Sequence, residues 1–150
     1  MDFFIQIWEN HVFWAAIWAW FIAQSLKVII VLIIEKRLDF RRLVGSGGMP
    51  SSHSSFVTAT SSMIGFMYGF DSALFALSFA IMCIVMYDAS GVRRAAGHQA
   101  AILNQIVEHW DEGPEIQGKR LKELLGHTPF EVIAGALLGV AISVVIHFLI

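Results

Sequence analysis

The sequence contains one cysteine and few charged residues. Cys83 has no second cysteine to pair with, so a disulfide within the chain is excluded, and one thiolate does not make a metal cluster. Only 15% of the 150 residues are charged and 57% are hydrophobic, an imbalance that is not typical of a soluble globular domain. No Lys or Arg precedes the first apolar run, which is also too long and too rich in tryptophan for a cleaved signal peptide. These absences favour an integral membrane protein.

Two apolar runs are long enough to cross a membrane as helices. Residues 12–34 contain one charge, Lys27, and residues 129–150 also contain one, Glu131. Each run has about the 20 residues that a helix needs to cross the hydrocarbon core. Two weaker apolar runs lie between them. We therefore expect one all-α domain over residues 1–150, a membrane-embedded helical bundle of four to five spanning helices with amphipathic interfacial helices; four spans are placed at 12–34, 52–70, 72–92 and 129–150.

Two further segments have the pattern of amphipathic helices. The first eleven residues mix aromatic and polar side chains, which predicts an interfacial helix anchored by Trp8. Residues 98–110 repeat large apolar side chains at helical spacing, which predicts a helix lying on the membrane or docked on the bundle. Residues 111–118 predict a polar loop, and residues 120–125 a short helix.

Positive charge is confined to one side of the expected bundle. The loops after the first and third spans emerge on the same side and carry nine of the ten basic residues. By the positive-inside rule this side is cytoplasmic, with both termini on the opposite side of what we expect to be a bacterial inner membrane. The tenth basic residue, Lys27, lies inside a span. The nine others are Lys36, Arg37, Arg41, Arg42, Arg93, Arg94, Lys119, Arg120 and Lys122.

The loop GSGGMPSSHSS, which precedes the second span, combines glycines, serines and a histidine. Small residues such as Gly48 let backbone N–H groups approach an anion, and the N-terminus of the following helix adds partial positive charge. Pro50 suits the start of that helix, with Ser51, Ser52 and His53 in its first turn. A simple turn with a helix cap explains the serines equally well, but capping does not call for the histidine.

Lys27 is the charged residue inside the first span. It lies eight residues before the end of the apolar run at Glu35, about two turns or roughly 12 Å below the loop. A charge at this depth is rare unless it faces the bundle interior, a cavity or an anion, which favours a functional role. The alternative is a lysine that snorkels to the interface.

The third span ends in the segment YDASGVRRAAG, in which Asp88 is followed by Arg93 and Arg94. An arginine suits phosphate oxygens because its guanidinium is planar and always charged. The two arginines fall on different faces of a helix. We therefore expect one of them to face a shared site and the other to anchor the helix on the cytoplasmic side.

The last span begins with the segment LGHTPFEVIAGALLGV. Thr128 as N-cap, Pro129 at the first helical position and Glu131 at the third form a capping box. Alternatively, Glu131 accepts a hydrogen bond from His127, fixing the ring tautomer as a carboxylate does behind a catalytic histidine.

The last span also carries two glycines, Gly135 and Gly139, at the spacing of a close helix contact. Such a pair suits packing within one chain or in a homodimer. Four further histidines are expected to lie outside the site: His11, His98, His109 and His147.

Taken together, GGMPSSHS, YDASGVRR and LKELLGHTPFEV resemble the divergent branch of the phosphatidic acid phosphatase type 2 family, which is related to acid phosphatases and vanadium haloperoxidases. PSSH at 50–53 is similar to the Pro-Ser-Gly-His motif of that family. HTPFE at 127–131 is similar to its later histidine, which an aspartate follows four residues on. The resemblance covers the chain from about Gln24 to its end.

The resemblance implies a lipid phosphatase that acts on phosphate mono- or pyrophosphate esters, with no metal or other cofactor. His127 would attack phosphorus, Glu131 would orient it, and His53 would protonate the leaving group. The expected partner is a membrane lipid, with no nucleic acid. The residues implied or expected to hold the phosphoryl group, with Asp88 in support, are Lys27, Gly48, Ser51, Ser52, and Arg93 or Arg94.

The chain departs from the family pattern at two positions. Leu121 stands where the family has an arginine six residues before the nucleophile, so Arg93 or Arg94 is expected to supply that charge. Ile34 stands where the family has an arginine seven residues after Lys27. Two other functions stay open: a non-catalytic protein that binds or moves phospholipid headgroups with the same cations, and a structural subunit.

Overall fold

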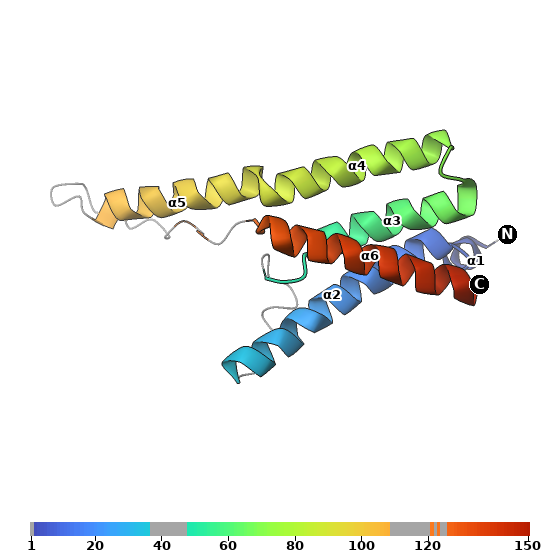
Figure 1. Cartoon of the computed structure of the whole chain (residues 1–150), viewed down its shortest axis with the longest axis horizontal. Coiled ribbons are helices and arrows are strands. Elements are labelled where there is room, and N and C mark those ends of the chain that lie inside the picture. Colours follow the sequence, from blue (N-terminus) through green and yellow to red (C-terminus); the bar gives the residue numbers. More distant parts are fainter. Residues whose placement is uncertain (1, 37–47, 109–120, 122, 124–125) are drawn as a thin grey trace.

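The structure, a computed structural model, describes residues 2–36, 48–108, 121, 123 and 126–150. These residues form helices and connecting turns, with no strand among them, which confirms the predicted all-α class. Figure 1 shows their arrangement. The helices are α1 (Phe3–Trp8), α2 (His11–Glu35), α3 (Ser52–Tyr68), α4 (Ala73–Ser90), α5 (Val92–Glu108) and α6 (Pro129–Leu149).

Among the described residues, three helical segments are long and apolar enough to cross a membrane: His11–Ile34, Ala73–Glu108 and Pro129–Leu149. The first and last of these correspond, within one residue at their ends, to the first and fourth predicted spans, and the third predicted span lies at the start of Ala73–Glu108. The second predicted span, 52–70, forms α3, which at 17 residues is shorter and packs against α2, α4 and α6. The bundle therefore surrounds one serine-rich helix with three strongly apolar ones.

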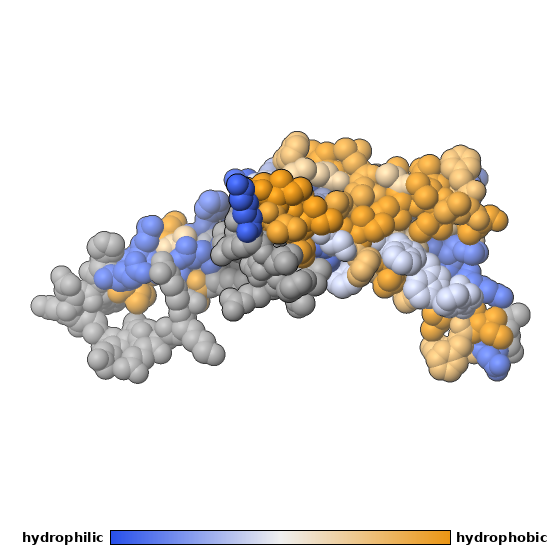
Figure 2. All heavy atoms as spheres, turned by 90° about the horizontal axis from the view of Figure 1, so that it is seen from below, coloured by the Kyte–Doolittle hydropathy of each residue, from blue (hydrophilic) through white to orange (hydrophobic). Residues whose placement is uncertain are grey.

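The exposed surface of the bundle is hydrophobic. Figure 2 shows hydrophobic side chains covering the middle of one face, with hydrophilic ones toward its ends. Leu77 and Ile84 of α4 and Leu137 of α6 are 60%, 68% and 67% exposed. Exposing such a surface to water is unfavourable, whereas contact with lipid chains is not, so the outside of the bundle is suited to a bilayer.

The buried face of α3 is polar, and its hydroxyl groups bond to the surrounding helices. Ser51, Ser54 and Ser55 are fully buried at its start. Inside a membrane a buried polar group needs a protein partner, because water is absent. Bonds between α3 and its neighbours satisfy this need: Ser55 Oγ to Ala19 O of α2 (3.2 Å), Ser78 Oγ of α4 to Ser61 Oγ (3.2 Å), and Ser143 Oγ of α6 to Ala59 O (2.9 Å).

The closest helix contact, between α3 and α6, depends on Gly135 and Gly139. A side chain at Gly135 would collide with the carbonyl oxygen of Ser51. At Gly139, a Cβ would lie 2.5 Å from Ser55 O and 2.9 Å from Ala59 N. The glycine pair is therefore used for packing within the chain.

The two ends of the bundle differ. Both termini lie at the end that also holds the turn between α3 and α4 (Figure 1). The starts of α3 and α6 and the junction of α4 with α5 lie at the other end. The segments around His53, Arg93 and His127, which the sequence singled out for chemistry, are therefore gathered at one end of the bundle of α3, α4 and α6, and α5 extends beyond this end.

The predicted amphipathic helix at 98–110 starts earlier than expected. It forms α5, which follows α4 after Gly91 and continues in nearly the same direction (Figure 1). Its buried residues are Gly97, Ala100 and Asn104, while its large apolar side chains are exposed.

Several predictions fall outside the described residues. They concern the polar loop at 111–118, most of the short helix at 120–125, His109 and six of the nine basic loop residues. At the N-terminus, the predicted interfacial helix forms α1, whose Trp8 carbonyl accepts a hydrogen bond from Trp14 Nε1 at 3.1 Å.

Replacing Gly139 with valine is expected to destabilise the bundle by about 1–3 kcal/mol, because the new side chain overpacks the contact with α3. Thermal unfolding in detergent measures this as a lower midpoint. Ala141→Val, on the exposed face of the same helix, is the matched control and should change stability by less than about 0.5 kcal/mol. Equal midpoints for the two variants would contradict the role of Gly139.

Candidate functional site

A small pocket lies at the end of the bundle where α3 and α6 begin. It brings together two histidines that the sequence nominated, His53 and His127, and one of the two candidate arginines, Arg93. Its other lining residues are Val85, Asp88, Ala89 and Gly126. Side chains from α3, α4, α5 and the segment before α6 thus meet at one place.

The backbone before α6 fixes the position of His127. Gly126 has a φ of +87°, in the left-handed region that favours glycine. A Cβ at this glycine would lie 2.5 Å from the backbone nitrogen of Arg94, so the chain runs directly against the start of α5. The next residue, His127, donates its backbone N–H to Ala89 O at 2.8 Å. The His127 side chain is buried, with 4% exposure.

Glu131 caps α6 and contacts His127 with the same oxygen atom. Its Oε2 accepts the backbone N–H of Thr128 at 2.8 Å and lies 3.3 Å from Nδ1 of His127. Thr128 Oγ1 accepts the backbone N–H of Glu131 at 3.3 Å, which completes the predicted capping box with Pro129 in the first turn. The two interpretations of Glu131 are therefore compatible. With Nδ1–H directed at the carboxylate, Nε2 is the ring nitrogen that remains for chemistry.

The surroundings of His127 favour its neutral form. Burial lowers the pKa of His127, and the carboxylate of Glu131 offsets only part of this effect. Positive charge at Lys27 and His53 lowers the pKa further, so that it lies below the usual value of 6.5. The imidazole is therefore uncharged at neutral pH, and its lone pair is available for nucleophilic attack.

The structure distinguishes between the two arginines. Arg93 Nε donates to Asp88 Oδ2 at 2.6 Å, and both residues line the pocket. Their side chains are 53% and 36% exposed, so the pair adds little stability but holds the guanidinium at the pocket. Arg94 is also exposed and does not line the pocket.

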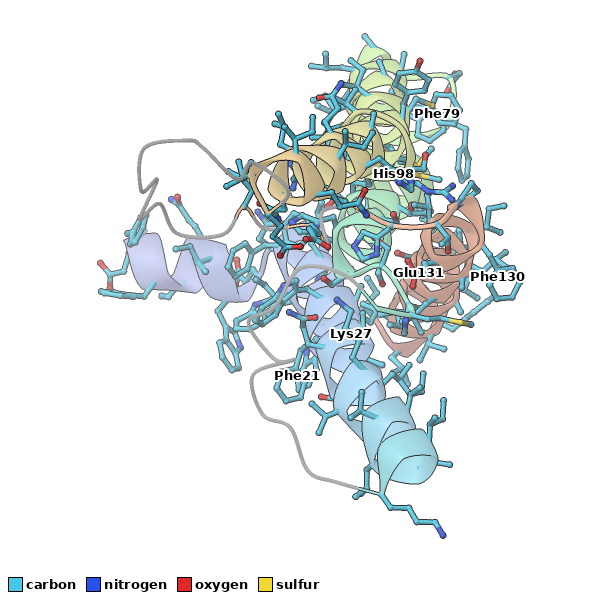
Figure 3. The ribbon with its side chains drawn as sticks, turned by 90° about the vertical axis from the view of Figure 1, so that its left-hand side faces the viewer. Phe21, Lys27, Phe79, His98, Phe130 and Glu131 are labelled. Carbon is cyan, nitrogen blue, oxygen red and sulfur yellow. The ribbon has the colours of Figure 1, made fainter. Side chains whose placement is uncertain are left out.

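Lys27 belongs to a second cluster beside the pocket. Its side chain is 3% exposed and points into the bundle (Figure 3), so it does not snorkel to the surface. Lys27 Nζ donates to Ser52 Oγ at 3.2 Å, and Gly48 lies against the lysine stem. These residues do not line the pocket, but the ammonium is near enough to affect the pKa of His127.

The start of α3 is joined to α6 through Ser51. Its side chain caps α3 by accepting the backbone N–H of Ser54 at 3.3 Å. Its own backbone N–H donates to Glu131 O at 3.0 Å. Pro50 precedes this cap and is not in the first turn of the helix, a correction to the predicted register. Ser51 is thus a structural link between the two elements that carry His53 and His127.

Asn104 has a role that the sequence analysis missed. It is 7% exposed on α5, and its Nδ2 donates to Leu121 O at 2.9 Å and to Glu123 Oε1 at 2.8 Å. Its Oδ1 accepts the Leu121 N–H at 3.0 Å. The side chain therefore bonds to both Leu121 and Glu123, which precede His127 by six and four residues. The signal in the sequence was its spacing, because Asn104 shares a helix face with the small residues Gly97 and Ala100.

The remaining described histidines lie apart from the pocket. His147 stacks on Phe66 near the end of α6, with ring centroids 4.9 Å apart, and His11 begins α2. His98 is exposed on α5. Among the residues described, no three His, Cys, Asp or Glu side chains are close enough together to hold a metal ion.

The fold and surface define an all-helical membrane protein with histidines and cationic side chains gathered at one end. A sequence profile of the Divergent PAP2 family matches residues 8–142, and the chain belongs to this family, as its motifs predicted. It is similar to the uncharacterized membrane protein YuiD of Bacillus subtilis (strain 168), with 41% identity over 137 residues, covering 84% of this chain and 87% of YuiD. No solved structure matches the chain.

Gly126→Ala is expected to displace the backbone at His127, because alanine is strained at positive φ and collides with the start of α5. Hydrogen exchange of peptides covering residues 126–130 should become faster as the bond to Ala89 is lost. Gly69→Ala, at a φ of +88° in the turn between α3 and α4, introduces similar strain far from the pocket. Unchanged exchange in the Gly126 variant would contradict the positioning role.

Proposed function

We propose that this chain is a membrane-embedded, metal-independent lipid phosphatase that hydrolyses a phosphate mono- or pyrophosphate ester through a phosphohistidine. One observation carries the proposal. A buried His127, with Nδ1 against Glu131, shares a pocket with His53 and Arg93. This arrangement supplies a neutral nucleophile, a second histidine for proton transfer and a fixed positive charge.

In the first step, Nε2 of His127 attacks phosphorus and the bond from phosphorus to the lipid oxygen breaks. Nδ1 keeps its proton, so the phosphorylated ring is cationic and is stabilised by the carboxylate of Glu131. Protonated His53 gives its proton to the departing oxygen. Proton transfer of this kind is worth about 10²–10⁴ in rate.

In the second step, water attacks the phosphohistidine. His53, now neutral, takes a proton from the water, and the bond between phosphorus and Nε2 breaks as inorganic phosphate leaves. His127 returns to its neutral form with the proton still on Nδ1. Both histidines end in their starting states, so the cycle balances without an added reactant.

The cations around the pocket would stabilise the transferring phosphoryl group, whose equatorial oxygens carry the charge. Arg93 uses Nε to bind Asp88 and has two further nitrogens that can donate to phosphoryl oxygens. Lys27 lies behind Ser52 and would act through that hydroxyl and through its field. Because Arg93 and Arg94 lie at this end, the positive-inside rule supports a cytoplasmic site with the termini opposite.

A second candidate function is the binding or movement of phospholipid headgroups without catalysis. The observation that favours it is the separation of the cluster of Lys27, Ser52 and Gly48 from the histidine pocket. Such a cluster could bind an anion whether or not His53 and His127 act on it.

Phosphate release from lipid monophosphates and pyrophosphates, measured in detergent with a chelator present, separates the two functions. His127→Ala and His53→Ala are each expected to lower the rate by about 10²–10⁴. His98→Ala, on the exposed surface of α5, should leave the rate unchanged. A wild-type protein that releases no phosphate, or that requires a divalent metal, would exclude the proposed mechanism. Headgroup binding that survives both histidine substitutions but not Lys27→Ala would then support the second function.

The pH dependence should report on His127. The nucleophile must be neutral, so the rate is expected to fall as pH decreases through the pKa of His127, which lies below 6.5. Glu131→Gln removes the carboxylate that raises this pKa, so the acidic limb should move to lower pH while the maximal rate decreases. Thr128→Ala weakens the helix cap by about 1 kcal/mol but keeps the carboxylate, so its limb should stay in place. A limb that moves equally in both variants would indicate a structural effect alone.

A further inference from the structure

An apolar groove runs along the face of α3 that is opposite to α6. Its floor is formed by Phe56, Thr60, Ile64 and Tyr68, which follow one another at intervals of four residues. One wall comes from the start of α2 and the other includes Leu74 of α4. Figure 1 shows α2 and α4 on either side of α3. The groove has a volume of about 340 Å³, within the range of ligand sites.

The groove leads toward the pocket. Its floor extends along α3 from Phe56 to Tyr68, twelve helical steps or a length of about 18 Å. One leaflet of a bilayer contributes about 15 Å of hydrocarbon. His53 precedes Phe56 by three residues and is exposed on the same face of α3. A chain of one-leaflet length in the groove would therefore place its polar end at His53.

Two polar groups along the groove form hydrogen bonds within their own helices. Thr60 Oγ1 donates to Phe56 O at 2.9 Å, one turn earlier in α3. Asn10 Oδ1, at the far end, accepts the backbone N–H of Phe13 at 2.9 Å. On the other faces of α3, in contrast, Ser55 and Ser61 bond to neighbouring helices. No described residue that lines the groove is charged, so the groove is suited to hydrocarbon.

We propose that this groove holds one hydrocarbon chain of the lipid whose phosphate enters the pocket, and that the chain enters sideways between α2 and α4. The inference rests on the proposed function and narrows its substrate class. The substrate would be a phosphate ester with a chain long enough to follow α3 through one leaflet. Short-chain phosphate esters would lack this contact and bind more weakly.

Photo-crosslinking tests the groove without requiring turnover. The protein, as His127→Ala to preserve the probe, is placed in phosphatidylcholine nanodiscs with hexadecyl phosphate that carries a diazirine at mid-chain. Labelling is expected on peptides of α2 and α3 that contain Ala16, Thr60 and Ile64, and unlabelled hexadecyl phosphate should compete. The same chain with a phosphocholine headgroup should label the exposed helices evenly.

A bulky substitution provides a second readout. Thr60→Trp fills the groove and is expected to reduce competable labelling about tenfold, which corresponds to 1.4 kcal/mol of affinity. Leu77→Trp, on the exposed surface of α4, introduces the same side chain outside the groove and should have no effect. If Thr60→Trp fails to fold, the test still stands on the protein that keeps Thr60, by comparing the labelling from the phosphate probe with the labelling from the phosphocholine probe.

The outcomes separate the groove from the enzyme activity. Groove labelling that is the same for both headgroups, or label spread evenly over the exposed helices, would overturn the inference. Phosphate-dependent labelling of the groove in a protein that releases no phosphate would count against catalysis alone. Loss of phosphate release from short-chain esters in Thr60→Trp would also count against the groove, because those esters do not reach it.

Discussion

The structure depends on the burial of a polar helix inside an apolar bundle. Each hydroxyl on the buried face of α3 needs a protein partner, since water is absent. Ser55 bonds to α2 and Ser61 to α4, the carbonyl of Ala59 accepts from α6, and Ser54 bonds to Ser51 at the start of α3. These bonds fix the rotation of α3 about its axis, and that rotation determines which side chains of its first turn face the pocket. Ser52 faces Lys27, whereas His53 faces the pocket. Local chemistry at one end therefore follows from hydrogen bonds made along the whole helix.

The site is assembled by backbone contacts as much as by side chains. The carbonyl group of Ala89 and the left-handed conformation of Gly126 bring His127 to the junction of α4 and α5. Asn104 of α5 bonds to two residues that precede His127. Glu131 then orients the ring with the oxygen that also caps α6. Stability and site geometry are consequently linked in this region, and a substitution there affects both.

The sequence predicted features that depend on local spacing. The all-α class, the capping box at Thr128 and the possible contact between His127 and Glu131 follow from residues a few positions apart. Which arginine faces the pocket was not predictable, because the phase of α5 depends on where Gly91 ends α4. The hydrogen bond from Lys27 to Ser52 was not predictable either, because it depends on the register of α2 against α3, and a local sequence pattern does not determine that register. The hydropathy of residues 52–70 indicated only a weak span. The reason is that α3 is enclosed by other helices, and an enclosed helix can be less apolar than helices that face lipid.

The hydrogen bond from the Ser51 backbone to Glu131 O has a mechanical consequence. It joins the beginnings of α3 and α6, which are already in close contact at Gly135. These two contacts hold the elements that carry His53 and His127 against each other, although the two residues are distant in sequence. On the other side of the pocket, Arg93 and Asp88 are held by an exposed ion pair, so this side is expected to adjust more easily when a phosphate group enters. One side of the pocket is thus held by backbone contacts between helices, and the other side is held by exposed side chains.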